Sequence, residues 1–358
     1  MRAVVRRSGQ LICDEVAQPA AGPGQTLVKT LLCGICGSDL HALHYLDHMV
    51  ALAKKAGGSD RMNPAADMVF GHEFVAEVIE HGPAGGRFKP GTRVVSVPMT
   101  FGPQGFEAIG YSNNFPGGFA EYMALTEAML IEVPNGLATD LAALTEPMAV
   151  GAHAVEQADL EPGSASLVLG CGPVGLAVIA ALKLRGHGPI IAADFSPARR
   201  RLAEKLGADV VVDPAEGSPH LKWADFGVPS SMMEHAMARM SGQLKGRSIV
   251  FECVGAPGVL QSVIEGCPPG SQILVAGVCM EPDSFEPSLC INKQLDLKFV
   301  LGYTPEEFAS TLHDIAEGRL DVAPLITGTV GLSGVAQAFT DLRDPEAHVK
   351  ILVNPSLA

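Results

Sequence analysis

The chain has 358 residues, of which 25 are Lys or Arg and 39 are Asp or Glu, so its formal net charge at pH 7 is −14. This acidic balance, without a dense basic cluster, excludes electrostatic binding to nucleic acid or to an anionic membrane surface. The eight cysteines are irregularly spaced and the N-terminus lacks the apolar core of a signal peptide, so we expect a soluble, cytoplasmic protein. The length favours two domains.

The first 130 residues are rich in predicted β-strands. Turn signals such as Pro23-Gly24 and Pro90-Gly91 separate short β-branched runs, which lie at 3–6, 26–32, 74–80 and 92–97. One segment differs, because apolar residues recur at helical spacing between Asp39 and Ala56 before Gly57-Gly58. This spacing predicts an inserted helix.

From about residue 150 the pattern changes to alternating strands and helices. Residues 163–182 carry no charge and are long enough to cross a bilayer, but Pro173 and several glycines in their middle favour a strand, a turn and a helix. Further apolar strands are predicted at 189–193, 210–212, 249–252, 273–276, 297–301 and 349–353. Such alternation predicts a doubly wound parallel sheet, so the fold class is α/β.

Helix boundaries in this second part are also marked. Ser196-Pro197 is an N-cap and first-turn pair for a helix that Gly207 ends. Thr304-Pro305-Glu306-Glu307 is a capping box for a helix that runs to Gly318. A cluster of methionines is interpreted as the packing face of another helix, at positions 232, 233, 237 and 240.

A glycine-rich motif occupies residues 170–175 and fits G-x-G-x-x-G. It follows a predicted strand, opens a predicted helix, and precedes the acidic residue Asp194 by 19 positions, which is the full context of a dinucleotide-binding turn. The helix N-terminus would hold the pyrophosphate on backbone N–H groups. The predicted cofactor contacts in this motif are Gly170, Gly172, Pro173, Val174 and Gly175.

The residue at the end of the second predicted strand indicates which dinucleotide binds. The carboxylate of Asp194 can accept hydrogen bonds from the ribose hydroxyls and would repel a 2′-phosphate, which favours NAD. Arg199 and Arg200 follow closely, and an arginine there can accommodate that phosphate. Arg199 is therefore a further candidate for cofactor binding.

Potential metal ligands lie in the β-rich part. Cys33-Gly34-Ile35-Cys36 has C-x-x-C spacing, but no second such pair exists to complete a four-cysteine zinc site. Gly71-His72-Glu73 and Thr145-Glu146-Pro147 add an imidazole and two carboxylates. One thiolate, one histidine and one carboxylate suit a catalytic Zn²⁺ that keeps an open position.

The order of these motifs resembles that of zinc-dependent medium-chain alcohol dehydrogenases, over essentially the whole chain. The motifs are Gly34-Ile35-Cys36-Gly37-Ser38-Asp39, Gly71-His72-Glu73, Gly117-Gly118-Phe119-Ala120-Glu121-Tyr122, Glu146-Pro147 and the glycine-rich turn. With Glu146 where many members have cysteine, the chain is most similar to the polyol and threonine dehydrogenase branch. The resemblance implies a GroES-like catalytic domain over 1–150, completed by 302–358, and a Rossmann domain over 151–301.

The resemblance also implies roles for single residues. Cys36 and His72 match zinc ligands, and Glu73 and Glu146 are both candidates for the third place. In the same way, Asp39 matches the residue that orients the zinc histidine, Ser38 the hydroxyl that takes the substrate proton, and His41 the histidine that relays it. The positions that match the backbone around the nicotinamide carboxamide are Ala276, Gly277 and Val278.

Two departures from the family pattern matter. Pro98–Gly118 holds no cysteine, where many members carry four that bind a structural zinc, so we predict one catalytic zinc and no structural zinc. Cys36 and His72 are 36 positions apart, which is longer than is usual in the family. The additional length contains the inserted helix, and it leaves the specific substrate open.

The combined prediction is an oxidoreductase that transfers a hydride between a secondary alcohol or polyol and NAD(H). A zinc-free quinone or enone reductase of the same fold and a non-catalytic NAD-binding sensor are the alternatives, and the Cys, His and Glu set counts against the first. The resemblance also implies a homodimer or homotetramer, in which strands around 273–276 and 297–301 pair across a two-fold axis. The expected partner is a small alcohol or ketone, with no nucleic acid and no membrane.

Overall fold

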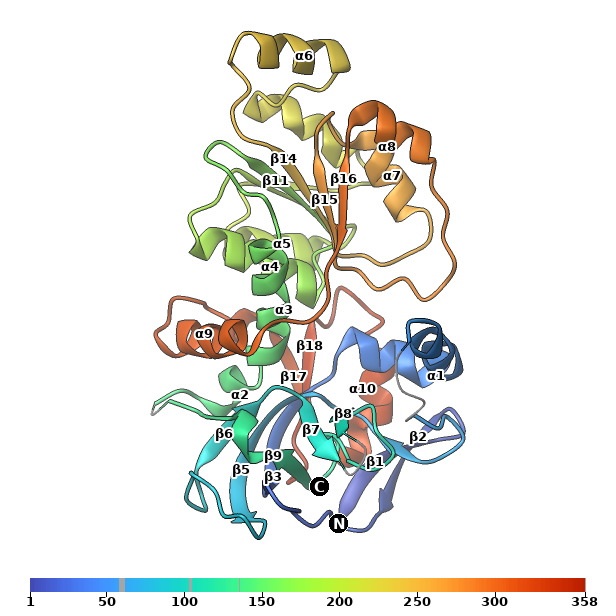
Figure 1. The fold of residues 1–358 in the computed structure, drawn as a ribbon, viewed down its shortest axis with the longest axis vertical. Coiled ribbons are helices and arrows are strands. Elements are labelled where there is room, and N and C mark those ends of the chain that lie inside the picture. The colour runs from blue at the N-terminus through green and yellow to red at the C-terminus, as the bar shows by residue number, and fades with distance from the viewer. Residues whose placement is uncertain (58–61, 103–104, 135, 358) are drawn as a thin grey trace. The chain divides into compact units, whose positions relative to one another are not determined.

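The computed structural model describes residues 1–57, 62–102, 105–134 and 136–357. The chain divides into two compact units, which we call unit 1 (Met1–Glu146 with Phe308–Ala358) and unit 2 (Pro147–Glu307) (Figure 1). Unit 1 is therefore built from both ends of the sequence, and unit 2 is one continuous segment. No helix in the described part of the chain is long and apolar enough to cross a membrane.

Unit 1 is mostly antiparallel β-structure. Its main sheet has the strand order β10-β6-β5-β3-β18-β17, and β9 also pairs with β3. These strands are β3 (Gln25–Gly34), β5 (Glu73–His81), β6 (Arg93–Ser96), β9 (Tyr122–Thr126), β10 (Leu130–Glu132), β17 (Ile326–Val330) and β18 (Lys350–Val353). The smaller sheets contain β1 (Arg2–Arg7), β2 (Gln10–Glu15) and β4 (Met68–Val69), and β7 (Met99–Gly102) with β8 (Gly105–Ala108).

The last strand of unit 1 joins segments that are far apart in the sequence. β18 pairs parallel with β17 and antiparallel with β3, where Leu352 lies opposite Gly34 and Val353 opposite Cys33. Buried side chains of β1, β3, β5 and β18 share one hydrophobic core with Val335 and Phe339. Strand β18 therefore stands directly beside the C-x-x-C segment.

The inserted helix is α1 (Gly37–Lys55), so the prediction of a helix in this segment is confirmed. Cys36 is its N-cap residue, and Tyr45 has non-helical dihedral angles that kink it. Ala42, Leu46 and Val50 are buried at helical spacing. The predicted stop at Gly57-Gly58 falls partly outside the described residues, because Gly58 is not described.

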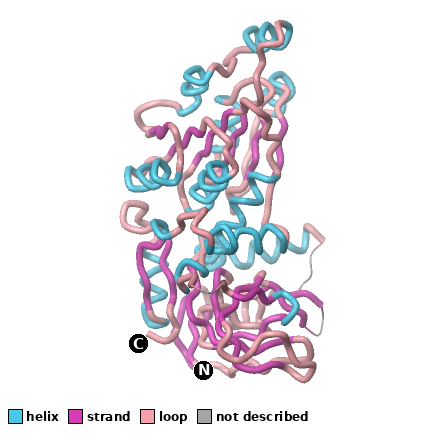
Figure 2. Tube along the Cα trace, turned by 90° about the vertical axis from the view of Figure 1, so that its left-hand side faces the viewer, coloured by secondary structure: helices cyan, strands magenta, loops and turns pink. Residues whose placement is uncertain are grey.

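Unit 2 contains a parallel sheet with the strand order β13-β12-β11-β14-β15-β16, which is the doubly wound order of a Rossmann fold. The strands are β11 (Ala165–Leu169), β12 (Ile190–Ala193), β13 (Val210–Val212), β14 (Ser248–Glu252), β15 (Gln272–Val275) and β16 (Asp296–Phe299). They run between helices, as Figure 2 shows. The predicted α/β class with a β-rich domain and a doubly wound parallel sheet is confirmed.

The helices of both units begin and end where local chemistry favours it. Ser196 accepts a hydrogen bond from the Arg199 N–H at the start of α5, and Gly207 ends it in the left-handed conformation. Thr304 and Glu307 form the predicted capping box before α9. The helices besides α1 are α2 (Thr139–Ala142), α3 (Thr145–Glu156), α4 (Pro173–Leu184), α5 (Pro197–Leu206), α6 (Met232–Met240), α7 (Val259–Gly266), α8 (Pro287–Lys293), α9 (Pro305–Ala316) and α10 (Val335–Asp341).

The interpretation of the methionine cluster as a packing face is wrong. Helix α6 turns its methionines to solvent, with exposed fractions between 49% and 90%, at Met232, Met233, Met237 and Met240. The helix instead directs His235 and Ala238 toward the rest of unit 2, where both line a cavity. The methionines do share one face of the helix, as their spacing predicts. That face is exposed, and the face that carries His235 and Ala238 is the one turned toward the rest of unit 2.

Candidate metal centre and dinucleotide site

Three predicted metal ligands meet in unit 1. One ligand atom each of Cys36, His72 and Glu73 lies within 4.8 Å of the others, and the histidine and glutamate are buried. Cys36 precedes α1, while Glu73 is the first residue of β5 and follows His72 directly. The turn into a helix and the start of a strand therefore bring a thiol, an imidazole and a carboxylate to one place.

Asp39 connects two of these groups. Its side chain is fully buried, Oδ2 accepts a hydrogen bond of 3.0 Å from the Cys36 N–H, and Oδ1 lies 3.4 Å from His72 Nδ1. The other ring nitrogen of His72, Nε2, faces Ser38 Oγ at 3.4 Å. Asp39 thus caps α1 and stands behind the histidine, in the position of a residue that orients a metal ligand.

The surroundings of His72 favour a bound cation. Burial alone would lower the pKa of His72, but the neighbouring Asp39 and Cys36 raise it well above its ordinary value. Nδ1 of His72 is buried and makes no hydrogen bond of good geometry with the described residues. The thiol, imidazole and carboxylate that meet here form a donor set that suits zinc, which would bind the imidazole in its neutral form.

Glu73 has a partner that sequence reasoning missed. Lys350 Nζ donates to Glu73 Oε1 at 2.7 Å and to Oε2 at 2.6 Å, and also to the Ile35 carbonyl at 3.0 Å. Both side chains are buried, and although burial would lower the pKa of Lys350, Glu73 raises it above its ordinary value. Gly34 leaves room for this carboxylate, because a Cβ at that position would overlap Glu73 Oε2. In the sequence this pair could have been suspected because Lys350 is the one charged residue of the predicted strand at 349–353.

Glu146, the other candidate for the third ligand, is buried at the start of α3. Its carboxylate is near enough to Lys350 to contribute to the raised pKa of that ammonium group. Glu146 is not part of the compact cluster of Cys36, His72 and Glu73. Two carboxylates therefore approach the same lysine, and Glu73 is the one that is bonded to it through both oxygens.

Ser38 and His41 lie on the first turns of α1. Ser38 Oγ accepts a hydrogen bond of 2.9 Å from Tyr111 Oη, a residue that the sequence analysis did not single out. The Tyr111 ring lies 5.3 Å from the His72 ring, measured between centroids. His41 is half-buried, and this burial lowers its pKa. The predicted proton-accepting hydroxyl thus lies beside the cluster, with a tyrosine next to it.

The predicted dinucleotide turn joins β11 to α4 in unit 2. Gly170 has a positive φ of 86°, and Gly172 is the N-cap residue of α4, with Pro173 in its first turn and Val174 following. A Cβ at Gly175 would overlap the Gly170 carbonyl oxygen, so only glycine lets the helix approach the strand so closely. This geometry leaves the first N–H groups of α4 available to a pyrophosphate.

Asp194 and the arginines after it lie beside this turn. Asp194 Oδ2 accepts a hydrogen bond of 2.7 Å from the Cys171 N–H, and Oδ1 accepts one of 2.8 Å from the Ser196 N–H. Arg200 forms an ion pair of 2.9 Å with Asp213. Arg199 lies near Gly172, and its buried Nε has no hydrogen-bond partner among the described residues. Of the two arginines, Arg199 is therefore the one available to a ligand.

The residues predicted to face the nicotinamide follow β15. The N–H groups of Ala276 and Gly277 donate to the Glu252 carbonyl at 2.9 and 2.8 Å, and Val278 is half-exposed. These three residues line a cavity of about 390 Å³ at the carboxyl ends of β14 and β15. The carboxyl edge of a doubly wound sheet is where such folds bind their ligands.

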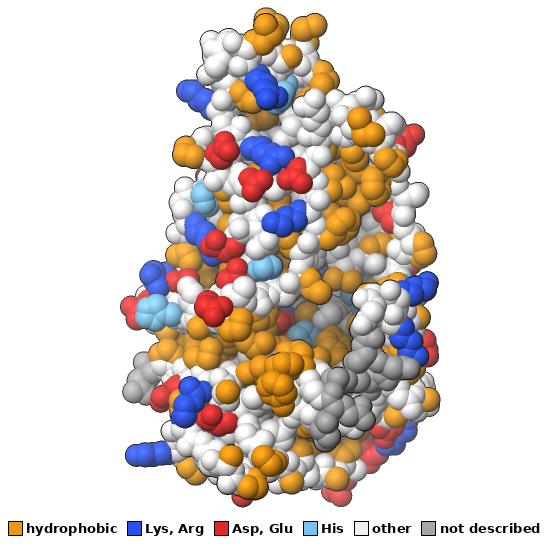
Figure 3. Space-filling view, viewed as in Figure 1, with side chains coloured by type: hydrophobic (Ala, Val, Ile, Leu, Met, Phe, Trp, Pro, Cys, Tyr) orange, Lys and Arg blue, Asp and Glu red, His pale blue; other side chains and the backbone are white. Residues whose placement is uncertain are grey.

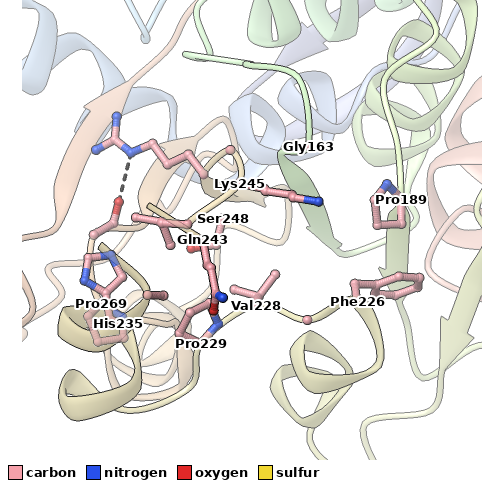
Figure 4. Close-up of a pocket in the computed structure, with 16 residues that line it drawn as sticks. Gly163, Pro189, Phe226, Val228, Pro229, His235, Gln243, Lys245, Ser248 and Pro269 are labelled. Atoms are coloured by element: carbon pink, nitrogen blue, oxygen red, sulfur yellow. Dashed lines mark hydrogen bonds between the residues drawn. The ribbon is translucent and has the colours of Figure 1, made fainter. Parts of the chain in front are cut away.

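A larger cavity, of about 610 Å³, lies at the opposite edge of the same sheet. Its walls include Gly163, Pro189, Ser248 and Gly270, which stand at the amino ends of four strands, and Figure 4 shows Val228 and His235 beside them. Ligands of doubly wound sheets bind at the other edge. None of the predicted site residues lines this cavity.

Comparisons with known proteins agree with the fold. Residues 22–135 match the alcohol dehydrogenase GroES-like domain, and residues 173–317 match the zinc-binding dehydrogenase family. An (R,R)-butanediol dehydrogenase of Bacillus subtilis is 32% identical over 96% of both chains, and an L-threonine 3-dehydrogenase of Sinorhizobium medicae is 26% identical over 96% of both. A solved zinc-binding dehydrogenase of Sinorhizobium meliloti, bound to NADP, is 26% identical with a TM-score of 0.80 over 99% of both chains.

The fold and the site together define an oxidoreductase that uses zinc and a nicotinamide cofactor on small-molecule alcohols. The chain belongs to the zinc-dependent medium-chain alcohol dehydrogenase family. The predicted family is thereby confirmed, and the comparisons do not favour the alternatives of a zinc-free reductase or an NAD-binding sensor.

Proposed function

We propose that the protein reversibly oxidises small secondary alcohols or polyols to ketones, with NAD as the hydride acceptor. The observation that carries the proposal is the meeting of the Cys36 thiol and the His72 imidazole next to the Ser38 hydroxyl, with the buried carboxylates of Glu73 and Glu146 both near Lys350. Relatives named as butanediol and threonine dehydrogenases act on compounds with a secondary hydroxyl, so small vicinal diols are the first substrates to test.

One zinc ion per chain is held by Cys36, His72 and Glu146 in this proposal. Glu73 is the less suitable third ligand, because both of its oxygens accept hydrogen bonds from the Lys350 ammonium group. The stretch 98–118 has no cysteine for a structural zinc, and the buried Glu107 carboxylate in it accepts hydrogen bonds from Ser112 and Asn114 instead. Glu146→Gln should therefore lower the zinc content of the purified protein more than Glu73→Gln.

Bound zinc supplies Lewis acidity that lowers the pKa of the substrate hydroxyl, and the nicotinamide supplies the hydride acceptor. Ser38 Oγ accepts the proton of that hydroxyl, and His41 passes a proton on toward solvent. Burial lowers the pKa of His41, so its imidazole is neutral and able to accept a proton at neutral pH. Asp39, fixed by the Cys36 N–H, keeps the His72 ring in place.

The dinucleotide is held in unit 2 by the turn at 170–175, by Asp194 and Arg199, and by residues 276–278. The carboxylate of Asp194 favours NAD over NADP, because it would repel a 2′-phosphate. Arg199, with its unpartnered Nε beside Gly172, is suited to a contact with the cofactor. In this assignment residues 1–150 with 302–358 form the catalytic domain, and residues 151–301 form the dinucleotide-binding domain.

The protein acts as a homodimer or homotetramer in this proposal. Strand β16 ends the order of the parallel sheet and pairs with β15 on one side. Hydrophobic side chains gather on the surface over β16 and α8 (Figure 3). Ile291 of α8, Phe299 of β16 and Leu301 just after β16 are 69% to 88% exposed. An unpaired, apolar edge strand is suited to pairing with the same edge of a second copy.

The function is tested by measuring NADH formation over a panel of vicinal diols, polyols, β-hydroxy amino acids and primary alcohols. Cys36→Ser should lose zinc and lower kcat/KM by at least about 100-fold, because removal of a metal ligand removes the Lewis acid. Cys13→Ser, which changes an exposed cysteine of unit 1, should keep both zinc and turnover. Unchanged turnover of Cys36→Ser with zinc absent would contradict the proposal.

A further inference from the structure

Tyr111 stands beside the metal cluster and has no part in the steps described above. Its backbone is held locally, since the Tyr111 N–H donates to the Ala108 carbonyl at 3.2 Å and the preceding Gly110 packs closely against the backbone of Gly71. The ring of Tyr111 packs against those of His72 and Phe70, at centroid distances of 5.3 and 6.0 Å. The phenol is therefore held in place by both backbone and ring contacts.

The hydroxyl group of Tyr111 has one proton and two acceptors within reach. Oη lies 2.9 Å from Ser38 Oγ and 3.3 Å from Asp39 Oδ1, so the shorter hydrogen bond goes to the serine. A phenol loses its proton only near pH 10, well above neutral pH. Tyr111 is consequently a protonated, neutral donor throughout the ordinary pH range.

We propose that Tyr111 is a positioning residue, whose O–H bond to Ser38 Oγ fixes the direction in which the serine accepts the proton of the substrate hydroxyl. This inference rests on the proposed function. A serine oxygen has two lone pairs and one proton, and its hydroxyl otherwise rotates freely. When the Tyr111 hydroxyl donates to one lone pair of Ser38 Oγ, the second lone pair can accept the substrate proton. The serine's own proton can then be passed to the relay.

The proton and electron balance of the step is simple. The substrate O–H bond breaks and its proton joins Ser38 Oγ, while the original proton of Ser38 leaves toward His41. The C–H electron pair leaves the carbinol carbon as hydride to the nicotinamide, and the ketone forms. Tyr111 keeps its proton throughout, so it acts through Ser38 and exchanges nothing with the substrate.

The test is a double-mutant cycle between Tyr111→Phe and Ser38→Ala. The phenylalanine ring keeps the contacts with His72 and Phe70 and removes only the hydroxyl. We expect Tyr111→Phe to lower kcat about tenfold with little change in KM, and to raise the solvent isotope effect on kcat, because the proton acceptor is less well oriented. In the Ser38→Ala background the same change should have no further effect, since the bond it removes is already absent.

Control measurements distinguish a positioning role of Tyr111 from a structural role. Tyr122→Phe, in β9, should leave kcat unchanged. The zinc content and the thermal stability of Tyr111→Phe should equal those of the parent. A crystal structure of Tyr111→Phe should show Ser38 in more than one rotamer. Additive losses in the cycle, or a single unchanged Ser38 rotamer, would overturn the positioning role. If the zinc-loaded parent oxidises no alcohol of the panel, the proposed function fails, and the rotamer measurement still decides the role of Tyr111.

Discussion

The two units differ in the buried ionisable groups that accompany their candidate sites. In unit 1 charged side chains are placed inside the protein and compensated by one another, as in the pair of Glu73 and Lys350 and in Asp39 beside His72. In unit 2 burial keeps two ionisable groups neutral: it raises the pKa of Cys171 to about 12 and, together with Lys293, lowers that of His220 to about 4. At the glycine turn the donors that would bind an anion are backbone N–H groups at a helix N-terminus.

This difference corresponds to what each unit has to hold. A metal cation needs anionic and imidazole ligands, and such ligands stay buried only when their charges are compensated. A pyrophosphate needs donors and a close approach, which glycines and a helix N-terminus provide from the backbone. Substitutions that remove a compensating charge and substitutions that obstruct the glycine turn should therefore have different effects.

The largest effect is expected for Lys350→Met. It leaves the buried Glu73 carboxylate without its ammonium partner, and the free energy of unfolding should fall by about 3–5 kcal/mol. Urea denaturation at pH 7 measures this loss. The double variant Lys350→Met with Glu73→Gln should recover most of it, whereas Lys89→Met, at an exposed lysine, should change little. Equal stability of Lys350→Met and the parent would show that Lys350 does not compensate the charge of Glu73.

A smaller effect is expected in unit 2 when the pH is lowered. The pKa of His220 falls from 6.5 to about 4 on folding, mainly through burial and then through Lys293. Between these values the unfolded chain binds a proton that the folded chain does not, so stability present above pH 6.5 is lost as the pH falls toward 4.

This loss should amount to about 2–3 kcal/mol at pH 4.5 relative to pH 7. His220→Phe removes the titrating group. Between pH 7 and pH 4.5 the free energy of unfolding of this variant should therefore fall by about 2–3 kcal/mol less than that of the parent. Urea denaturation of both proteins at the two pH values provides the comparison, with His313→Phe, at an exposed histidine, as the control. An identical pH dependence of the His220 variant and the parent would be evidence for a charged, compensated histidine in unit 2 as well.

The glycine turn should respond to a single methyl group. Gly175→Ala places a Cβ against the Gly170 carbonyl and should raise the Kd for NADH by about tenfold, because the helix N-terminus is displaced from the turn. A fluorescence titration with NADH measures the change. Gly217→Ala, where a Cβ meets no atom within 4 Å, is the matched control. Unaltered NADH binding by Gly175→Ala would place the dinucleotide elsewhere.

An effect of about the same size is expected for Asp194→Asn, which removes a charge and keeps the size of the side chain. The ratio of kcat/KM for NAD to that for NADP should fall about tenfold, equivalent to about 1.4 kcal/mol, because the repulsion of a 2′-phosphate is lost. Initial rates with each cofactor give the ratio. The control Asp225→Asn, at an exposed aspartate, should leave this NAD to NADP ratio unchanged. A similar change of the ratio in both variants would contradict a direct role of Asp194.

Local patterns made most of the fold predictable. The strand, glycine turn and helix at 165–184 occupy one short segment, and the Ser196 cap and the Thr304 capping box are equally local, so each was found from neighbouring residues. The metal cluster of Cys36, His72 and Glu73 also came together as expected. It required the family resemblance, because spacing alone does not say which thiol of the C-x-x-C pair turns toward the histidine.

What the sequence did not reveal depends on long-range contacts or on a choice of face. Lys350 is 277 positions from Glu73 in the chain, and no local pattern pairs them. Tyr111 lies on an irregular stretch without periodicity, where the direction of a side chain follows from tertiary packing. The methionines of α6 were assigned to the wrong side because hydrophobic spacing identifies a face of a helix, and does not say whether that face is covered.

The position of Lys350 on strand β18 also affects how the protein is made. Unit 2 is complete once residue 307 has been synthesised, and it can fold while the chain is still growing. The Glu73 carboxylate was synthesised much earlier, and it must wait for β18 before its charge is compensated. A ribosome stalled before residue 350 should therefore carry a Glu73 carboxylate that still lacks its ammonium partner, so that the buried charge of unit 1 is compensated only after β18 has been made.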